Sequence, residues 1–535
     1  MNEPSAGAAV IPVGRLAKAA TLMAAATVGS RLLGVVREIV AAALFGATDA
    51  KAAYVIAYYL PFFVQRLLLG GTLSIVFIPT ISRYLARRDE QEARRVSGTL
   101  LTLVLLLGLV MVAAGELAAP LLVRIAAPGF AGSAEFISLA VGLTRIIFVA
   151  MLFLALSLFV TGFLQAHHQF TVPALSPLLF NLVIIGGTLA LGPRIGIVGL
   201  ALSWVAGTAA QFAVQLPAAR ALGLTLRAAD LRHPAVREIG RLAVPAMLGL
   251  AVVEINAYVD RFFASLLPLT AAANPVAVLD YAYEVIQAPA GIFAISIATA
   301  IFPLLSRHAA AGASDDLRAT GSLGLRTTLV AILPVTALIL ALHQPLIRLV
   351  FQRGEFGPAA TAAVSAAMSA YAVGLPAIAA YYVVTRVYYA LRDMATPVRL
   401  GVGMVLLNAV LDYLLMQVFG TVGIALATSI VATINVGTLL WLLRRRLGAI
   451  DGRRLLRTGM RAAAAAAAAA GAMVIAAAKL GPPAGAALLA GQIVQVGGAT
   501  LIGAVTYLLV CWLLRVEELQ VIRGLLRRAG PDAAR

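Results

Sequence analysis

Long apolar runs that carry almost no charge are the feature that most limits how this chain can fold. Residues 172–191 contain no charged side chain, residues 402–411 contain none, and residues 100–122 contain only Glu116. About 20 apolar residues in a helix cross about 30 Å of hydrocarbon. A lipid-facing barrel would need apolar and polar residues to alternate, whereas these runs are continuous. The sequence therefore predicts an all-α integral membrane protein.

Composition supports this interpretation. The 535 residues are 61% hydrophobic and 12% charged, whereas a soluble domain is about 45–50% apolar and about 25% charged. Residues 1–14 are polar and small and the first apolar run is long, which argues against a cleaved signal peptide. The single Cys511 excludes an internal disulfide. The net charge of +18 is better explained by basic cytoplasmic loops than by nucleic acid.

The apolar runs predict fourteen transmembrane spans. Arginine and lysine concentrate in alternate loops, for example Arg83, Arg87 and Arg94 after the second span. By the positive-inside rule, both termini are expected in the cytoplasm. The predicted spans are 16–44, 53–85, 98–125, 137–166, 172–192, 196–219, 236–266, 277–306, 322–345, 361–391, 398–418, 421–443, 459–479 and 488–514.

An internal repeat with an offset of 224 residues links the first six spans to the next six. Six is an even number, so both halves enter the membrane from the same side as a parallel repeat. Two such lobes imply a central cavity and alternating access, which is the physical basis for predicting a transporter. The matching residues are Arg37 with Arg261, Pro79 with Pro303, Ser82 with Ser306, Arg83 with Arg307, Arg124 with Arg348, Ala166 with Ala390, Pro173 with Pro397, and Val198, Gly199 and Ala201 with Val422, Gly423 and Ala425.

Charged side chains inside the predicted spans are candidate functional groups. A charge at mid-bilayer costs about 2.5–3.5 kcal/mol on insertion scales, so it should face a cavity, a partner or the interface. The residues concerned are Arg31, Arg37, Glu38, Arg66, Glu254, Asp260, Arg261, Glu284, Arg386 and Asp412.

The arginines of the first two spans are candidates for phosphate binding. Arg31 and Arg37 lie six residues apart, so both can border one wide helix face. Guanidinium groups in a dry cavity would clamp phosphate oxygens bidentately, and Arg66 could assist. Alternatively, Arg37 pairs with a nearby acid or these side chains snorkel to an interface. Both interpretations stay open, and Arg386 can be interpreted in the same way as an anchor for its span.

A second constellation is acidic. Asn408 and Asp412 are four residues apart and share a helix face, Thr428 lies in the next span, and Asp260 lies in the seventh. Carboxylate, amide and hydroxyl oxygens suit a hard cation such as Na⁺. The alternatives are a hydrogen-bonded polar knot between helices, or Asp260 paired with its neighbour Arg261. No Cys/His metal cluster, phosphate-binding loop or nucleophile–base pair is present in the sequence, so an enzyme is not expected.

Six short segments are distinctive when taken together: GSRLLGVVRE at 29–38, FGATDA at 45–50, IPTISRY at 78–84, APGF at 127–130, FQRGEF at 351–356 and YYALRDMATPV at 388–398. With these segments the chain resembles the MurJ (MviN) family of the multidrug/oligosaccharidyl-lipid/polysaccharide exporter superfamily. The resemblance covers nearly the whole chain, in order and spacing.

The resemblance implies a flippase that moves lipid II, the undecaprenyl-diphosphate-linked peptidoglycan precursor, to the outer leaflet of the bacterial cytoplasmic membrane. It implies two six-helix lobes with a cationic cavity, and spans 13 and 14 forming a groove for the lipid tail. The two first-span arginines of the family match Arg31 and Arg37, and a second-span arginine falls at Gln65 beside Arg66. The family's sodium-site pattern matches Asp260, Asn408, Asp412 and Thr428.

The chain departs from the family pattern in two places. The family reads Y-A-D-R in the eighth span, whereas this chain has Tyr281, Ala282, Tyr283 and Glu284, so an acid stands in place of arginine. A family aspartate near the outer end of the second span falls at Ala52, close to Asp49. With the arginine lost, Arg261 or Arg66 would have to complete a diphosphate clamp, and Glu254 and Glu284 would give the cavity acidic character.

We therefore expect a lipid II flippase in the bacterial inner membrane, driven by membrane potential, Na⁺ or both. A flippase or cation-coupled antiporter for another substrate and a non-transporting membrane scaffold are the alternatives. No cofactor is required and Na⁺ is the candidate ion. Expected partners are lipid II, membrane lipids and cell-wall synthesis proteins, without nucleic acid. The expected organisation is a cytoplasmic tail at 1–14, a first lobe at 15–219, a linker at 220–235, a second lobe at 236–446, a helix pair at 447–514 and a tail at 515–535.

Overall fold

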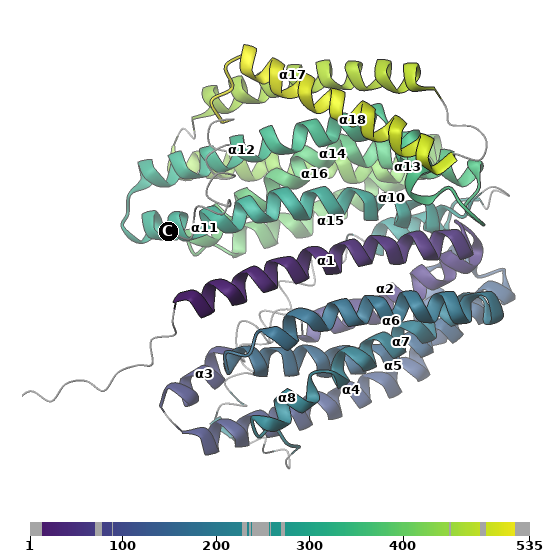
Figure 1. Cartoon of the computed structure of the whole chain (residues 1–535), viewed down its shortest axis with the longest axis vertical. Helices are drawn as coiled ribbons and strands as arrows, with labels where there is room; N and C mark the ends of the chain where they lie inside the picture. The colour runs from purple at the N-terminus through teal and green to yellow at the C-terminus, as the bar shows by residue number, and fades with distance from the viewer. Residues whose placement is uncertain are drawn as a thin grey trace, which may run out of the picture. The chain divides into compact units, whose positions relative to one another are not determined.

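The described part of the chain is helical. Its helices are joined by short turns, and no β-strand occurs in these ranges (Figure 1). This agrees with the predicted all-α class. The computed structural model describes residues 13–69, 78–87, 89–226, 230, 233–234, 237, 256, 258–268, 273–448, 451–481 and 488–518.

The chain divides into two compact units. The first comprises residues 1–45 and 53–254, and the second comprises residues 46–52 and 255–535. In the first unit, α1 packs on α6, α6 on α7, and α5 on both α4 and α7. Its helices are α1 (Val13–Phe45), α2 (Asp49–Leu69), α3 (Ile78–Ala86), α4 (Glu90–Ala126), α5 (Ala134–Ala166), α6 (Thr171–Ile195), α7 (Ile197–Ala213) and α8 (Leu216–Ala221).

In the second unit, α14 packs on α16, α15 on α16, and α12 on both α14 and α17. A π-helical turn at Ala290–Ala294 follows Pro289 and joins α10 to α11. Residues 258–265 form a further helical stretch. The other helices are α10 (Pro275–Pro289), α11 (Ile295–Ala310), α12 (Ser314–Ala341), α13 (His343–Phe351), α14 (Pro358–Ala390), α15 (Ala395–Phe419), α16 (Thr421–Leu447), α17 (Gly452–Leu480) and α18 (Leu488–Leu513).

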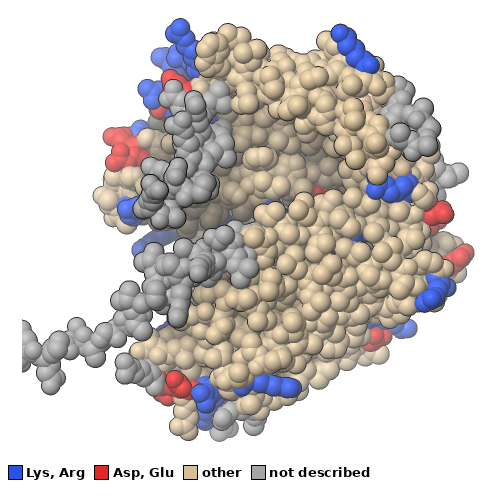
Figure 2. Space-filling model, viewed as in Figure 1, with Lys and Arg blue, Asp and Glu red and all other residues tan. Residues whose placement is uncertain are grey.

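Eleven helices of the described ranges are long and apolar enough to cross a membrane, with α7–α8 and α10–α11 each counted as one. Charged side chains gather mostly near helix ends, and the helix sides in view are almost free of them (Figure 2). Three predicted spans are not among the eleven. Residues 16–44 fall in α1, residues 53–85 cover α2 and α3, and most of 236–266 lies outside the described residues. The count of fourteen therefore stays a prediction.

The boundaries of two pairs of helices follow the 224-residue offset. Helices α5 and α14 run over residues 134–166 and 358–390, and α6 and α15 run over 171–195 and 395–419. The turns between them repeat as well. His168 and Arg392 have φ of 59° and 58°, and Gly196 and Gly420 have φ of 62° and 55°. Since left-handed backbone is rare outside glycine, this coincidence at one offset indicates that the two turns are built in the same way.

Helices α17 and α18 lie beyond the repeat, and within the second unit α17 packs on α12 and α18 on α13. Ala462, Ala465 and Ala469 of α17 join Tyr507 and Cys511 of α18 in one buried cluster with α12. The Tyr507 hydroxyl donates to the backbone oxygen of Val330 at 2.8 Å. Small alanine side chains allow the close helix approach that packing within a membrane requires.

Candidate functional site

Four residues predicted to form an ion site meet in the second unit. Asp260 lies in the helical stretch 258–265, Asn408 and Asp412 lie one turn apart on α15, and Thr428 lies on α16. Asn408 Nδ2 donates to Asp260 Oδ1 at 2.8 Å and to Asp412 Oδ2 at 2.7 Å. Thr428 Oγ1 donates to Asp260 Oδ2 at 3.0 Å, and the Tyr371 hydroxyl donates to the same oxygen at 3.5 Å.

These side chains are shielded from solvent. Asp260 is 2% exposed, Asn408 and Asp412 are 0% exposed, and Thr428 is 9% exposed. Two carboxylates bridged by one amide in such surroundings repel each other strongly, because a low dielectric screens little. A proton or a bound cation on one of the carboxylates would relieve this repulsion.

Two oxygens of this cluster have the properties of ligands for a cation. Asn408 Oδ1 and Asp412 Oδ1 are buried and have no hydrogen-bond partner among the residues that the structure describes. Buried acceptors without partners are rare, and a hard cation takes oxygen ligands of this kind. Among the described residues, no group of three or more His, Cys, Asp or Glu could hold a metal. The oxygen donors of the cluster suit a hard cation better than a soft transition metal.

A second charged cluster was not predicted. The Asp280 carboxylate lies 3.5 Å from Lys51 Nζ and 3.6 Å from Arg261 Nη2. Lys51 Nζ lies 4.6 Å from the centre of the Tyr281 ring, and Arg261 Cζ lies 5.6 Å from the centre of the Tyr283 ring. Both cations are buried, with 2% and 4% exposure. The sequence analysis did not single out Asp280. Its position inside the predicted span 277–306 marks it as a charged residue that needs a partner.

The structure gives less information about the remaining acidic candidates and Arg66. Glu284 is exposed on α10. Glu254 lies outside the described residues, and so does the side chain of Arg66, whose backbone belongs to α2. The expectation that Glu254, Arg261 and Glu284 set the charge of the cavity stays a prediction, and so does the role of Arg66 in a diphosphate clamp.

The two first-span arginines lie in different surroundings within the first unit. Arg31 is exposed and has no ion pair with the described residues. Arg37 has several partners, among them Glu38, Asn181 and Trp204. Its guanidinium donates to Glu38 Oε1 at 3.1 Å and to Asn181 Oδ1 at 3.4 Å, and it lies 5.4 Å from the centre of the Trp204 ring. The pairing of Arg37 with a nearby acid is therefore present, and the phosphate clamp stays a prediction.

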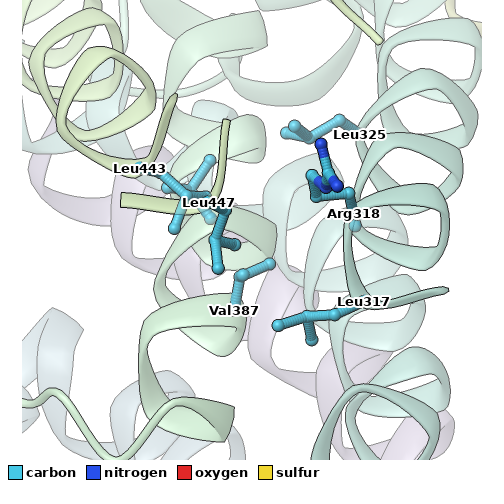
Figure 3. Close-up of a pocket in the computed structure, with 8 residues that line it drawn as sticks. Leu317, Arg318, Leu325, Val387, Leu443 and Leu447 are labelled. Atoms are coloured by element: carbon cyan, nitrogen blue, oxygen red, sulfur yellow. The ribbon is translucent and has the colours of Figure 1, made fainter. Parts of the chain in front are cut away.

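A small apolar pocket occurs elsewhere in the second unit. It lies between α12, α14 and α16, and its walls include Leu317, Leu325, Val387 and Leu443 (Figure 3). Arg318 is the charged side chain in its wall, and it pairs with Asp315. None of the predicted site residues lines this pocket, so it does not belong to the charged clusters.

The chain is similar to known membrane transport proteins in sequence. A family model described as "Lipid II flippase MurJ" matches residues 41–486. The chain is 32% identical over 442 residues to "Probable lipid II flippase MurJ" of Vibrio cholerae serotype O1, covering 79% of this chain and 82% of that protein.

Solved structures share the fold. A lipid II flippase MurJ in an inward closed conformation has a TM-score of 0.75 at 24% identity, covering 92% of this chain and 99% of that one. An inward-facing multidrug resistance transporter of the MATE family and MOP superfamily has a TM-score of 0.64 at 16% identity, covering 79% and 96% of the two chains. These likenesses show the fold alone.

Proposed function

The chain belongs to the lipid II flippase MurJ family, and we propose that it moves lipid II from the inner to the outer leaflet of the bacterial cytoplasmic membrane. The match of the family model over residues 41–486 carries this proposal. The eleven apolar helices of the described ranges support a multi-pass protein of that membrane. Both termini are assigned to the cytoplasm by the charge of the loops. The reaction is transport and breaks no covalent bond.

The proposed mechanism is alternating access by the two halves of the repeat. The diphosphate and sugar headgroup enters from the inner leaflet while the polyprenyl tail stays in lipid along α17 and α18. Arg31 is the first contact for the diphosphate, because its exposed guanidinium has no competing ion pair among the described residues. Arg37 would join only by exchanging its contacts with Glu38 and Asn181 for phosphate oxygens. Arg66 completes the proposed clamp.

Sodium is the proposed coupling ion. Asp260, Asn408, Asp412 and Thr428 would hold it, and the unpartnered oxygens of Asn408 and Asp412 support this assignment. A bound Na⁺ supplies the positive charge that two adjacent carboxylates require. Membrane potential can act on the same charges, since one elementary charge moved across 100 mV is worth about 2.3 kcal/mol.

A related second candidate is transport of another polyprenyl-linked glycan. The observation that favours it is Glu284, an exposed acid of α10 at the position where the family carries arginine. An acid there lowers the positive charge offered to a diphosphate and changes the polar groups offered to the sugars.

Complementation separates these candidates. A strain depleted of its own lipid II flippase should survive when this protein is expressed in its membrane. Failure of rescue at matched expression would contradict lipid II as the substrate. Transport of an alternative glycan is then tested by measuring outer-leaflet accumulation of that lipid, with Glu284→Arg as the variant expected to shift preference toward lipid II.

A further inference from the structure

The end of α16 and the start of α17 form a strongly basic surface that the proposed transport mechanism does not use. Six arginines are exposed here, and we call them the α16–α17 junction. Asp451 is the one acidic residue between positions 444 and 461. The junction comprises Arg444, Arg445, Arg446, Arg453, Arg454 and Arg457.

Few carboxylates neutralise the junction. Arg446 pairs with Asp393 at 2.6 Å, and Arg454 lies 3.8 Å from Asp451. Arg444, Arg453 and Arg457 have no ion pair with any residue that the structure describes. Two carboxylates can balance two of the six cations, so the surface keeps a marked positive excess.

The length of α17 places these arginines beside the membrane surface. Residues 462–478 of α17 carry no charge. At 1.5 Å per residue this segment is about 26 Å long, close to the roughly 30 Å of a hydrocarbon core. The preceding turns, which hold Arg453 and Arg457, then lie at headgroup level. On α16, Arg445 lies 3.7 Å from the centre of the exposed Trp441 ring, and tryptophan favours the same interfacial layer.

The junction is also amphipathic. Leu456 and Met460 are 63% and 59% exposed. Leu456 follows Arg453 by three residues and Met460 follows Arg457 by three, so all four side chains lie on one stripe of α17. A stripe of cations and apolar side chains at an interface suits a ligand that has an anionic head and an apolar tail.

Contacts on the inner face of α17 hold this stripe in place. Thr458 Oγ1 donates to Glu518 Oε1 at 3.3 Å, and the same carboxylate oxygen lies 2.5 Å from Arg326 Nη1. Arg461 Nη1 donates to the backbone oxygen of Arg515 at 3.2 Å. The residues after α18 therefore fix α17 against α12, while its opposite side faces outward.

We propose that the α16–α17 junction binds the phosphate groups of anionic bilayer phospholipids. Guanidinium groups match phosphate oxygens bidentately, and clusters of four to eight basic residues beside a span are typical of anionic-lipid binding. Trp441, Leu456 and Met460 contact the upper acyl chains. The positive-inside rule assigns this leaflet to the cytoplasmic side.

The test uses the full chain in nanodiscs of phosphatidylcholine, with or without phosphatidylglycerol. Bound lipid is counted by native mass spectrometry, and the unfolding temperature is measured in parallel. Phosphatidylglycerol should bind and stabilise the wild type. The triple variant Arg444→Gln, Arg453→Gln, Arg457→Gln should bind about a hundredfold more weakly, because each basic residue near an anionic surface contributes roughly fivefold.

A matched control removes the same charge elsewhere. Arg87, Arg94 and Arg220 are exposed arginines of the first unit, and their triple change to Gln should leave phosphatidylglycerol binding intact. Equal loss in this control would mean diffuse attraction and would overturn the proposal. Retained binding by the junction variant would overturn it as well.

A salt titration and a second lipid probe complete the test. Should the junction variant fail to fold, the titration of the wild type decides, since lipid held by exposed charges must be released as ionic strength rises. Binding that persists at high salt contradicts the proposal. Undecaprenyl diphosphate in phosphatidylcholine nanodiscs is the second probe. If the junction variant loses this lipid while its phosphatidylglycerol binding is unchanged, the junction serves the transported substrate and the proposal is overturned.

Discussion

The Lys51 ammonium lies 3.5 Å from the Asp280 carboxylate, which joins the first turn of α2 to α10. Tyr281 and Asn274 reinforce this connection, because the Tyr281 hydroxyl donates to the Gly46 oxygen at 3.2 Å and Asn274 N donates to the Ala47 oxygen at 2.7 Å. The segment 46–52 is accordingly part of the second unit, although the chain on both sides belongs to the first.

Asp280→Asn should destabilise the protein more than Lys51→Met. Asp280 serves two buried cations, Lys51 and Arg261, and removing one partner of a buried ion pair costs about 3–5 kcal/mol. In Lys51→Met the aspartate keeps Arg261, so the loss should be smaller. Thermal unfolding in detergent measures both. Equal unfolding temperatures for the two variants would show that the carboxylate does not hold the cluster together.

Sodium should stabilise the wild type against unfolding, and Asp412→Asn should abolish the effect. A ligand that binds only the folded state, and is present at a concentration 100 times its Kd, raises the free energy of unfolding by about 2.7 kcal/mol. The comparison is Na⁺ against choline at constant ionic strength, which removes general screening. Asp315→Asn, at a side chain that is 91% exposed, is the control that should keep the response. If Asp412→Asn keeps the sodium response, this cluster is not the sodium site. The alternative, a hydrogen-bonded polar knot between helices, would then be the correct interpretation.

The sequence was sufficient to predict this cluster because its spacing is local and its repeat is regular. Asn408 and Asp412 share a face by helix geometry alone. The constant 224-residue offset predicted helices whose ends the structure then places at matching positions in α5 and α14 and in α6 and α15. Thr428 and Asp260 could be added because each lies in a span of the same half of the repeat.

Contacts between distant segments could not be predicted in the same way. Lys51 precedes the predicted span 53–85, and nothing in the sequence marks it as buried, yet it is 2% exposed and pairs with Asp280. Asn181 accepts a hydrogen bond from Arg37 Nη1. It carries no charge and lies inside an apolar run, so the sequence did not indicate that it would be a partner of Arg37. Such pairings depend on how helices pack, and periodicity along one helix does not contain that information.

Arg37→Ala should lower both stability and transport, whereas Arg31→Ala should lower transport alone. Arg37 bonds to Glu38 and Asn181, and hydrogen bonds to charged groups contribute about 1.5–3 kcal/mol each. Arg31 is exposed and makes no ion pair with the described residues, so its removal should not affect stability. Unfolding temperature and rescue of a flippase-depleted strain are the paired measurements. Full rescue by both variants would reject the proposed diphosphate clamp.

The free energy of unfolding should fall in acid because Asp393 becomes protonated there. Burial acts to raise the pKa of Asp393, but hydrogen bonds from the Thr396 backbone and side chain and the charge of Arg446 outweigh it, so the pKa lies below its ordinary value of 3.8. A carboxylate whose pKa is lowered by folding stabilises the protein fully above that ordinary value, and the contribution is lost as pH falls through the lowered pKa.

The measurement for Asp393 is the unfolding temperature of wild type and Asp393→Asn from pH 7 downward. The wild type should be more stable by about 1 kcal/mol near neutrality, the range of a partly exposed ion pair, and the gap should close below pH 3.8. Arg446→Gln is the control that should narrow the gap while the hydrogen bonds from Thr396 to Asp393, at 3.0 and 2.8 Å, remain. A gap of constant size down to the lowest pH would mean that the Asp393 carboxylate does not stabilise the start of α15 through its charge.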